Sequence, residues 1–266
     1  MSIVDDIVKR YDDKVKILNK IAKFFNRNLF FNKNALDYCT INRGFTKKSI
    51  DDFLIGYDTD KLLEFIEKEK INFEYLIELG VLSQNKNNSY YDKFSGRIIF
   101  PVFDLKGNII GFSGRIWQSG DNRSKYVNST LSTVYQKSLS LYGLYQALND
   151  IIESNLVLVV EGNSDVITCH QEDIKITVSS CGTSFTEEHF LILNQFTNRF
   201  IFCFDNDESG KKSIERVKKL LSTKKDIKTG YLKIEGSKDL DEFIQNYGSN
   251  SLKESILKLE SQLRSV

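Results

Sequence analysis

Residues 156–207 decide the fold: they open with the run LVLVVEGNSD (156–165) and close with RFIFCFDND (199–207). Each run is apolar at first and turns polar at its carboxyl end. Apolar strands that alternate with helical stretches are typical of a parallel α/β sheet, whose strands are covered on both faces. The pattern predicts four strands, at Leu156–Val160, Ile176–Ser179, Arg199–Phe204 and Tyr231–Ile234.

Helices are expected between these strands. The segment Ser184-Phe-Thr-Glu187 has the spacing of a capping box, in which a hydroxyl group and a carboxylate cap the first turn of a helix. Ser209–Lys219 is rich in lysine and predicts a basic helix.

The first half of the chain predicts a different architecture. Apolar side chains at an approximately helical spacing predict an opening helix within residues 4–27, and Thr46 is the expected N-cap of short helices that continue to Gly80. The apolar runs 97–104 and 108–115 predict a β-hairpin around Lys106-Gly107. The expected fold class is therefore α/β, with a helical and mixed α+β N-terminal subdomain followed by a parallel α/β sheet domain. The expected domains are residues 1–148, residues 149–248 and a C-terminal helix over residues 249–266.

Composition excludes several classes of protein. Of the 266 residues, 41% are hydrophobic and 27% are charged, which is ordinary for a globular domain. No apolar run approaches the roughly 20 residues that cross a bilayer, and the charged start is unlike a secretion signal. We expect a cytoplasmic protein without a membrane segment. The single proline and the abundance of Lys, Asn and Ile are typical of an AT-rich genome, such as that of a bacteriophage or a low-GC bacterium.

The cysteines and histidines predict no zinc site. The side chains concerned are Cys39, Cys169, Cys181, Cys203, His170 and His189. The cysteines form no CxxC pair, and neither histidine lies at a zinc-ligand spacing beside them. We expect reduced, structural cysteines, structural or surface histidines, and no zinc in this chain.

The net charge of +1 hides a separation along the chain. Residues 86–145 carry eight basic and three acidic side chains, whereas residues 150–210 carry two basic and eleven acidic ones. The first segment suits phosphate groups and the second suits a divalent cation.

Acidic side chains follow three of the four predicted strands, and in open α/β sheets the ligand binds beyond the carboxyl ends of the strands. The acids are Glu161 and Asp165 after the first strand, Asp205 and Asp207 after the third, and Asp239 and Asp241 after the fourth. Carboxylates are ligands of Mg²⁺ and Mn²⁺, so this edge is expected to support two-metal phosphoryl chemistry, with Asp205 and Asp207 as the first choice for ligands. The alternative for each acid is that it caps the helix that follows.

The pattern Glu161-Gly with Asp205-x-Asp207 resembles the Toprim domain, which is shared by bacterial-type primases, type IA and II topoisomerases and some nucleases. The preceding segments resemble motifs of DnaG-type primases: Tyr91-Asp-Lys-Phe-Ser-Gly-Arg-Ile-Ile-Phe-Pro, Gly111-Phe-Ser-Gly-Arg115, Lys125-Tyr-Val-Asn-Ser129 and Lys137 to Tyr145. Asn42-Arg-Gly-Phe-Thr46 and Phe53-Leu-Ile-Gly-Tyr57 resemble the N-terminal subdomain of that family. The likeness extends from about residue 35 to about residue 245.

This resemblance implies a DNA primase, a DNA-directed RNA polymerase that makes short RNA primers on single-stranded DNA by two-metal nucleotidyl transfer. It implies a catalytic role for Glu161, Asp205 and Asp207. The implied ligands of Mg²⁺ or Mn²⁺ are Glu161, Asp165, Asp205, Asp207, Asp239 and Asp241. The implied lining of a basic groove for nucleotide and nucleic acid is Arg43, Arg97, Arg115, Lys125, Asn128 and Lys137. Tyr126 is placed either to stack on a base or to pack in the core.

The sequence departs from the family at two points. Asn163 and Ser164 stand where these primases carry an aromatic and an apolar residue. The sequence also contains neither the zinc-binding module nor the helicase-docking domain that flank this core in the family. The expected partners are therefore the template, ribonucleoside triphosphates, the replicative helicase and a separate zinc-binding module. The alternatives are a Toprim-type nuclease and a noncatalytic nucleic-acid-binding adaptor of the replisome.

Overall fold

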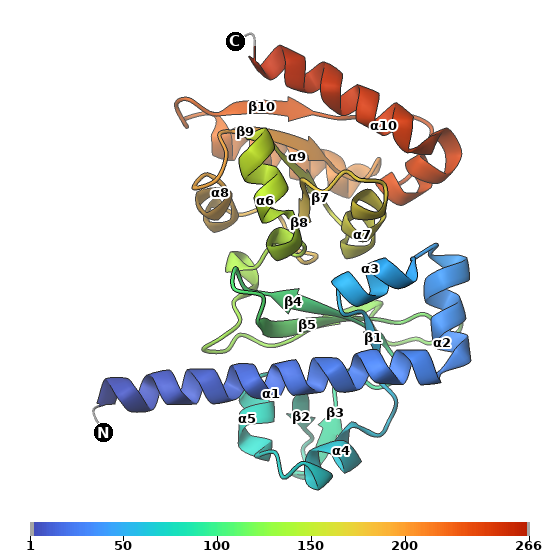
Figure 1. The fold of residues 1–266 in the computed structure, drawn as a ribbon, viewed down its shortest axis with the longest axis vertical. Coiled ribbons are helices and arrows are strands. Elements are labelled where there is room, and N and C mark those ends of the chain that lie inside the picture. The colour runs from blue at the N-terminus through green and yellow to red at the C-terminus, as the bar shows by residue number, and fades with distance from the viewer. Residues whose placement is uncertain (1–2, 265–266) are drawn as a thin grey trace. The chain divides into compact units, whose positions relative to one another are not determined.

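The structure is a computed structural model that describes residues 3–264 (Figure 1). The chain forms two compact units, residues 1–136 and residues 137–266, and each unit has a hydrophobic core of its own. None of the helices within residues 3–264 combines the length and the hydrophobicity that a membrane span needs.

The first unit opens with the long helix α1 (Ile3–Phe31), which confirms the predicted opening helix and extends past its predicted end. Leu18 and Phe25 are completely buried on one face of α1. This face lies so close to strand β1 (Gly56–Tyr57) that a Cβ atom at Gly56 would lie 2.6 Å from the Cβ atom of Phe25. Glycine at this position therefore allows the helix and the strand to pack together.

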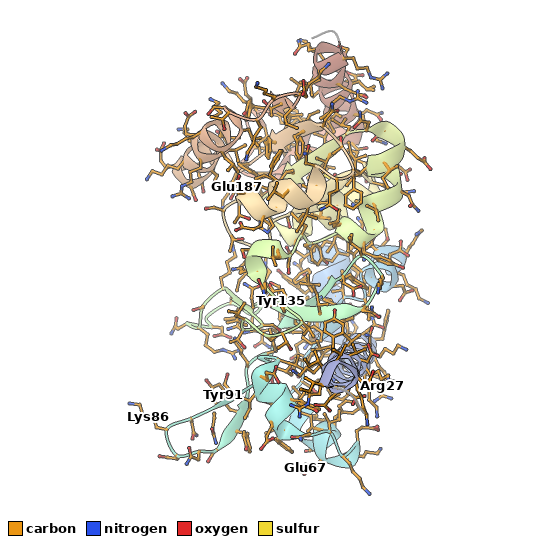
Figure 2. All side chains as sticks on the ribbon, turned by 90° about the vertical axis from the view of Figure 1, so that its left-hand side faces the viewer. Arg27, Glu67, Lys86, Tyr91, Tyr135 and Glu187 are labelled. Atoms are coloured by element: carbon orange, nitrogen blue, oxygen red, sulfur yellow. The ribbon has the colours of Figure 1, made fainter. Side chains whose placement is uncertain are left out.

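Short helical segments follow α1: α2 (Lys33–Asp37), the π-helix η1 (Tyr38–Asn42), α3 (Lys47–Asp52), α4 (Leu62–Lys68) and α5 (Phe73–Glu78). The predicted N-cap at Thr46 is confirmed, because its hydroxyl oxygen accepts a hydrogen bond from the backbone N–H of Ser49 at 3.1 Å. A small hairpin of β2 (Leu82–Gln84) and β3 (Tyr90–Asp92) projects from this unit, with Lys86 near its tip (Figure 2).

An antiparallel sheet in the order β1-β4-β5-β6 completes the first unit. Its longer strands are β4 (Ile98–Phe103) and β5 (Ile109–Arg115), and β6 (Tyr126–Asn128) lies at its edge. The predicted hairpin is confirmed. Its turn contains Gly107 with a φ of 82°, which is a backbone conformation that favours glycine.

The second unit contains a parallel sheet in the order β10-β9-β7-β8. The strands are β7 (Val157–Val160), β8 (Thr177–Ser179), β9 (Arg199–Cys203) and β10 (Lys228–Tyr231). The first three predicted strands are confirmed, but the fourth, placed at Tyr231–Ile234, is wrong. An edge strand such as β10 tolerates polar residues, whereas Leu232 and Ile234 are buried in the irregular segment beyond it and gave the apolar signal.

The helices of the second unit are the 3₁₀-helix η2 (Lys137–Leu139), α6 (Leu144–Ser154), α7 (Asn163–Gln171), α8 (Glu187–Leu193), α9 (Glu208–Leu221) and α10 (Leu240–Arg264). The basic helix predicted at Ser209–Lys219 is confirmed as α9. The backbone of α10 is interrupted at Gly248, whose φ is 78°.

The predicted capping box at Ser184 and Glu187 is wrong by two residues. Thr186 is the N-cap of α8, and its hydroxyl oxygen accepts the N–H of His189 at 3.1 Å. The Nδ1 atom of His189 accepts the N–H of Thr186 at 3.2 Å. An imidazole nitrogen thus acts as the acceptor that a carboxylate usually provides, which explains the misplaced prediction.

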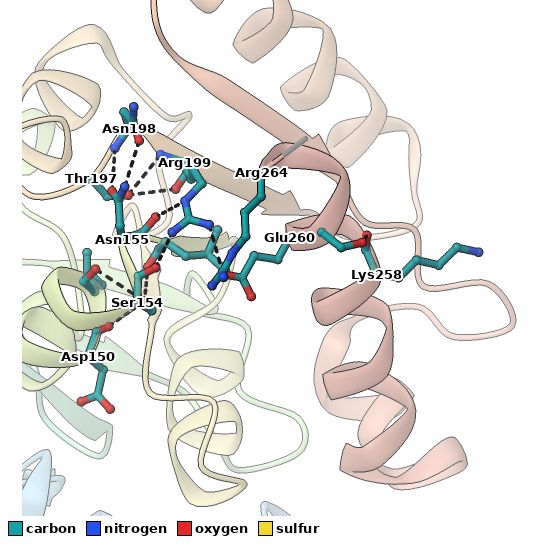
Figure 3. A network of polar contacts seen from close by, with 12 residues as sticks. Asp150, Ser154, Asn155, Thr197, Asn198, Arg199, Lys258, Glu260 and Arg264 are labelled. Atoms are coloured by element: carbon teal, nitrogen blue, oxygen red, sulfur yellow. Dashed lines mark hydrogen bonds and ion pairs between the residues drawn. The ribbon is translucent and has the colours of Figure 1, made fainter. Parts of the chain in front are cut away.

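A network of polar contacts fixes the amino end of β9 (Figure 3). Arg199 donates from Nε to the carbonyl oxygen of Asn155 at 2.7 Å and from Nη2 to that of Ser154 at 2.6 Å. Its Nη1 atom lies 3.1 Å from Oε1 of Glu260, and both side chains are only about one-tenth exposed, at 11% and 12%. The network joins α6, β9 and α10 at the end of the sheet opposite to the carboxyl ends of its strands.

Candidate active site

The strand β7 ends at Val160 and places Glu161 at the carboxyl edge of the parallel sheet. Asp165 lies in the first turn of α7, where its Oδ2 atom accepts the N–H of Gly162 at 3.1 Å. A Cβ atom at residue 162 would lie 2.7 Å from that oxygen, so a larger residue there would displace the carboxylate of Asp165. Asp165 is only 6% exposed. The turn therefore carries one partly exposed acid, Glu161, and one buried acid, Asp165.

The strand β9 leads into a second tight turn that carries Asp205 and Asp207. Asp207 is the N-cap of α9, with Oδ1 accepting the N–H of Gly210 at 2.8 Å. A Cβ atom at Gly210 would lie 2.0 Å from the carbonyl oxygen of Asp205, so this turn also depends on glycine. The N–H of Asn206 donates to the carbonyl oxygen of Lys238 at 2.8 Å, which holds the turn beside the segment that carries the last two acids.

Asp239 and Asp241 lie at the start of α10. Asp239 accepts the N–H of Glu242 at 2.9 Å and caps this helix. Asp241 is only 4% exposed, and its Oδ1 atom accepts the hydroxyl group of Thr168 on α7 at 2.9 Å. This hydrogen bond fastens the start of α10 to α7.

Helix capping, the alternative that the sequence left open, accounts for part of the geometry of three of these acids. Asp165, Asp207 and Asp239 each accept a backbone N–H in the first turn of a helix. An ionised carboxyl group can accept about four hydrogen bonds or metal contacts. Capping therefore fixes the position of each acid without using up its oxygens.

The acids of the three turns interact electrostatically. Burial, followed by the charges of Asp205 and Asp207, raises the pKa of Glu161 to about 7. Burial is also the main cause that raises the pKa of Asp165 to about 8. The charges of Asp205, Asp239 and Asp241 contribute to that second shift. Asp205 acts on both groups, so the structure brings all six predicted acids within electrostatic reach of one edge of the sheet.

The chemistry of this edge fits a divalent cation. The Oε1 atom of Glu161 is buried and has no hydrogen-bond partner, and a cation would relieve the repulsion among the carboxylates. Within residues 3–264, no group of three or more His, Cys, Asp and Glu side chains is arranged to hold a metal ion as it stands.

The predicted basic residues fall in both units. Arg115 lies at the end of β5, where Nη1 donates to the hydroxyl oxygen of Tyr126 at 2.9 Å and the guanidinium group lies 5.5 Å from the centre of that ring. Tyr126 is 38% exposed, so it is not a core residue. Arg43 is partly exposed after η1, and Lys125 is exposed before β6.

Two further predicted groove residues are partly buried. Asn128 ends β6, and its Oδ1 atom is buried with no hydrogen-bond partner. Lys137 belongs to the second unit, where its Nζ atom lies 3.3 Å from the carbonyl oxygen of Gly182.

Arg97 corrects the prediction of a groove-lining side chain. It is only 2% exposed. Its Nη1 atom donates to the carbonyl oxygen of Ser124 at 2.8 Å and lies 3.4 Å from those of Gly114 and Lys125. Arg97 is therefore bonded to the backbone that leads into β6, and its burial leaves almost no surface for a phosphate group.

Several further side chains shape the site in ways that were not predicted. Thr168 holds Asp241 through a contact between helices that are distant in sequence. Asn163 is 5% exposed, and its Oδ1 atom accepts the hydroxyl group of Ser179 at 3.0 Å. Gly210 was recognisable, because a glycine in the first turn of a helix directly after an acidic turn indicates a close backbone approach.

Comparisons with known proteins agree with this geometry. Residues 24–148 match the family described as the N-terminal domain of the DNA primase catalytic core, and residues 158–244 match the family described as Toprim-like. The chain belongs to the DnaG-type primase family. The resemblance inferred from the motifs is thereby confirmed, and so is the fold class.

Relatives and solved structures of this family resemble most of the chain. A DNA primase of Buchnera aphidicola is 36% identical over 247 residues, which make up 90% of this chain and 42% of that protein. The Aquifex aeolicus primase, solved with its zinc-binding and RNA polymerase domains, is 29% identical with a TM-score of 0.85, over 93% of this chain and 61% of that one. A DnaG primase catalytic domain bound to single-stranded DNA is 28% identical with a TM-score of 0.84, over 94% of this chain and 82% of that one.

The chain spans about two fifths of the length of the curated relatives that it matches, 42% in each of the first two. It corresponds to the catalytic core of those proteins. The nuclease and adaptor alternatives share the Toprim part of the fold, but the match over residues 24–148 is to a primase domain.

Proposed function

We propose that this chain is the polymerising core of a DNA primase, which joins ribonucleotides on a single-stranded DNA template. The observation that carries the proposal is the edge of the parallel sheet, where Asp205 acts electrostatically on both Glu161 and Asp165. A set of carboxylates at the carboxyl ends of strands is suited to phosphoryl transfer, because they can hold the cations that neutralise phosphate charge.

The proposed ligands of Mg²⁺ or Mn²⁺ are Glu161, Asp165, Asp205, Asp207, Asp239 and Asp241. When bound, two such ions lower the pKa of an attacking 3′-hydroxyl group and neutralise the charge of the pyrophosphate that leaves. The helix caps at Asp165, Asp207 and Asp239 hold three of these carboxylates in place before any ion binds. Little rearrangement of the backbone is then needed.

Residues outside the acidic edge are proposed to bind the template and the triphosphate. Arg115 and Tyr126 support each other through a hydrogen bond and a contact of the guanidinium group with the ring, and an exposed tyrosine can stack on a base. Lys125 and Arg43, which belong to the same unit as Arg115 and Tyr126, would contact phosphate groups. Lys137, in the second unit, is the proposed contact to the triphosphate.

The relatives support the proposed partners. One related structure contains single-stranded DNA, and another contains a zinc-binding domain beside the RNA polymerase domain. We propose single-stranded DNA as the template, ribonucleoside triphosphates as substrates, and a zinc-binding module and the replicative helicase as protein partners. A bacterial cell, with a bacteriophage as a possible source of the gene, is the proposed setting.

A primer-synthesis assay tests this function. The protein is incubated with single-stranded DNA, labelled ribonucleotides and Mg²⁺ or Mn²⁺, and the products are separated on a denaturing gel. The test variant is Asp205→Asn/Asp207→Asn, because asparagine at residue 207 can still cap α9 while the two charges are lost. The matched control is Glu208→Gln, which removes an exposed charge of the same turn that pairs with Lys211.

We expect short ribonucleotide products from the wild type and the control, and a loss of at least about 100-fold in the double variant. Cleavage of the DNA without synthesis would favour the nuclease alternative. Binding of DNA without either reaction in both metals would favour the adaptor alternative. Equal synthesis by the double variant and the wild type would exclude the proposed site.

A further inference from the structure

Two carboxyl groups meet inside the first unit, apart from the acidic edge of the parallel sheet. Asp58 follows β1, and Asp92 is the last residue of β3. Asp58 is completely buried, at 0% exposed, and the mutual effect of the two groups on their pKa values places its carboxyl group within hydrogen-bonding reach of that of Asp92. Both carboxyl oxygens of Asp58 and the Oδ2 atom of Asp92 are shielded from solvent, and no N–H or hydroxyl group of the described residues is hydrogen-bonded to any of the three.

Two full negative charges cannot share such a contact, because burial removes the water that would stabilise them. A hydrogen bond between two carboxyl groups requires a proton on one of them. The backbone indicates which one holds it. The Oδ1 atom of Asp92 accepts the N–H of Phe94 at 2.8 Å, which stabilises the ionised form of Asp92. Asp58 receives no such donor, so the proton belongs to Asp58.

The surroundings of Asp58 favour the same assignment. The charges that act on it are those of Asp92 and Asp60, and both are negative. Burial, followed by these charges, raises the pKa of Asp58 well above its usual value. Tyr57 also lies beside the pair, and its own pKa is raised by burial and then by Asp58 and Asp60. The cations of the adjoining loop are Lys93, whose pKa is lowered by burial, and Arg97. Neither is among the charges that shift the pKa of Asp58.

The pair fastens a loop that leads to the predicted template-binding surface. The N–H of Asp58 donates to the carbonyl oxygen of Arg97 at 3.0 Å, and its carbonyl oxygen accepts the N–H of Gly96 at 2.8 Å. Arg97 in turn donates to the carbonyl oxygen of Ser124 at 2.8 Å. Asp58, the loop of residues 92–97 and the backbone before Lys125 therefore form one continuous chain of hydrogen bonds.

We propose that Asp58 is a positioning residue that stays protonated in the folded protein, and that its carboxyl group, by donating to Asp92, holds Arg97 against the backbone that presents Lys125. The link to Lys125 rests on the proposed function, in which Lys125 contacts the template. The assignment of the proton to Asp58 is independent of the proposed function, because it follows from the burial of Asp58 and from its lack of hydrogen-bond donors.

Asp58→Asn tests the proton. Asparagine has the same shape and can donate to Asp92, but it cannot ionise. The control is Asp60→Asn, which removes the exposed neighbouring charge. The equilibrium constant of unfolding is measured in urea between about pH 5 and pH 9 for the wild type and both variants.

The direction follows from the pKa. Because the folded pKa of Asp58 is raised above the unfolded value of about 4, the stability that its proton contributes is lost as the pH rises toward the folded pKa. Relative to Asp58→Asn, the unfolding constant of the wild type should therefore increase by up to about tenfold per pH unit in this window. A ratio that does not change with pH overturns the proposal.

Two further measurements check whether a proton or a cation lies between the carboxyl groups of Asp58 and Asp92. The infrared band of protonated carboxyl groups should be weaker in Asp58→Asn than in the wild type at neutral pH, because one of the protonated groups is lost while Glu161 and Asp165 still contribute to the band. An unchanged spectrum contradicts the assigned proton. Mg²⁺ and Ca²⁺ should shift the stability of both proteins equally. A larger shift in the wild type would mean that a cation, and not a proton, joins the two carboxyl groups.

Fluorescence anisotropy with labelled single-stranded DNA tests the positioning role. Asp58→Asn, which keeps a donor to Asp92, should bind the DNA with the affinity of the wild type, whereas Asp58→Leu, which has no donor, should bind it several-fold more weakly. Equal affinities of Asp58→Leu and the wild type overturn the positioning role. If none of the three proteins binds DNA at any pH, the proposed function fails, while the unfolding measurement still decides whether Asp58 holds the proton.

Discussion

At the scale of single residues, Glu161 and Asp165 are proposed metal ligands, and their burial destabilises the folded protein when no metal ion is bound. Burial and neighbouring carboxylates raise the pKa of Glu161 to about 7 and that of Asp165 to about 8. Near neutral pH these groups hold protons for part of the time. Protons and divalent cations therefore compete for the same oxygens.

This competition predicts how stability depends on pH. Both folded pKa values lie above the unfolded values of about 4, so metal-free protein should lose stability as the pH rises from about 4 to about 8. Mg²⁺ should raise the melting temperature more at pH 8 than at pH 6, because fewer protons then compete with it. Calorimetry of the wild type and of Glu161→Gln/Asp165→Asn would check both effects. An equal response to Mg²⁺ at the two pH values would contradict the prediction.

Individual acids could be found from the sequence, but the surroundings of each charge could not. The acids stand directly after apolar runs, which is a local pattern. Arg97 and Asp58 are different, because their burial depends on strands and loops that meet only in the folded unit. Arg97 was predicted to line a groove since it stands in a basic motif. A local pattern does not reveal which way a long side chain turns.

At the scale of elements, the turn from β9 into α9 depends on Gly210. The backbone of Asp205 approaches residue 210 so closely that a side chain has no room. Helix propensity alone would favour alanine over glycine in α9. Glycine at residue 210 lowers the helix propensity of α9, but it leaves the room that the backbone of Asp205 needs.

Gly210→Ala should therefore lower primer synthesis by at least about tenfold, while the far-ultraviolet circular dichroism stays like that of the wild type. The reason is that the new Cβ atom would lie 2.0 Å from the carbonyl oxygen of Asp205 and must push this acid aside. Gly230→Ala in β10 is the control, since its Cβ atom would meet its nearest neighbour at an ordinary 3.5 Å. Full activity of Gly210→Ala would show that the turn tolerates the shift.

Elements were predictable where their signal is local. The hairpin of β4 and β5 has apolar runs on either side of a glycine turn. All of β7 and residues 200–203 of β9 are apolar because both faces are covered. β10 was misplaced because an edge strand needs less burial. The cap of α8 was misplaced because His189 supplies an acceptor that sequence rules assign to acids.

At the scale of the whole molecule, the chain divides after residue 136, whereas the sequence placed a boundary after residue 148. Residues 137–148 contact the parallel sheet directly. Tyr142 and Ser179 exchange two backbone hydrogen bonds, at 2.8 and 3.0 Å. Leu144 and Ala147 of α6 belong to the core of the second unit.

Two fragments would distinguish the boundaries. We expect residues 137–266 to unfold cooperatively in urea, with a midpoint well above that of residues 149–266. The shorter fragment loses the Tyr142–Ser179 pairing and part of the apolar face of α6, and buried apolar side chains contribute roughly 1.5–3 kcal/mol each. Equal midpoints would favour the boundary after residue 148.

The two attachments of α10 connect the two ends of the parallel sheet. Its start is fastened to α7 through Asp241 and Thr168 beside the acidic edge, and its end is fastened to β9 through Glu260 and Arg199 at the opposite end of the sheet. The two helical parts of α10, on either side of Gly248, are therefore each attached to a different end of the sheet. Amide protons of α7 and of the first residues of β9 should therefore exchange with heavy water at linked rates. Breaking the ion pair between Glu260 and Arg199 should also make the amide protons beside Asp241 exchange faster.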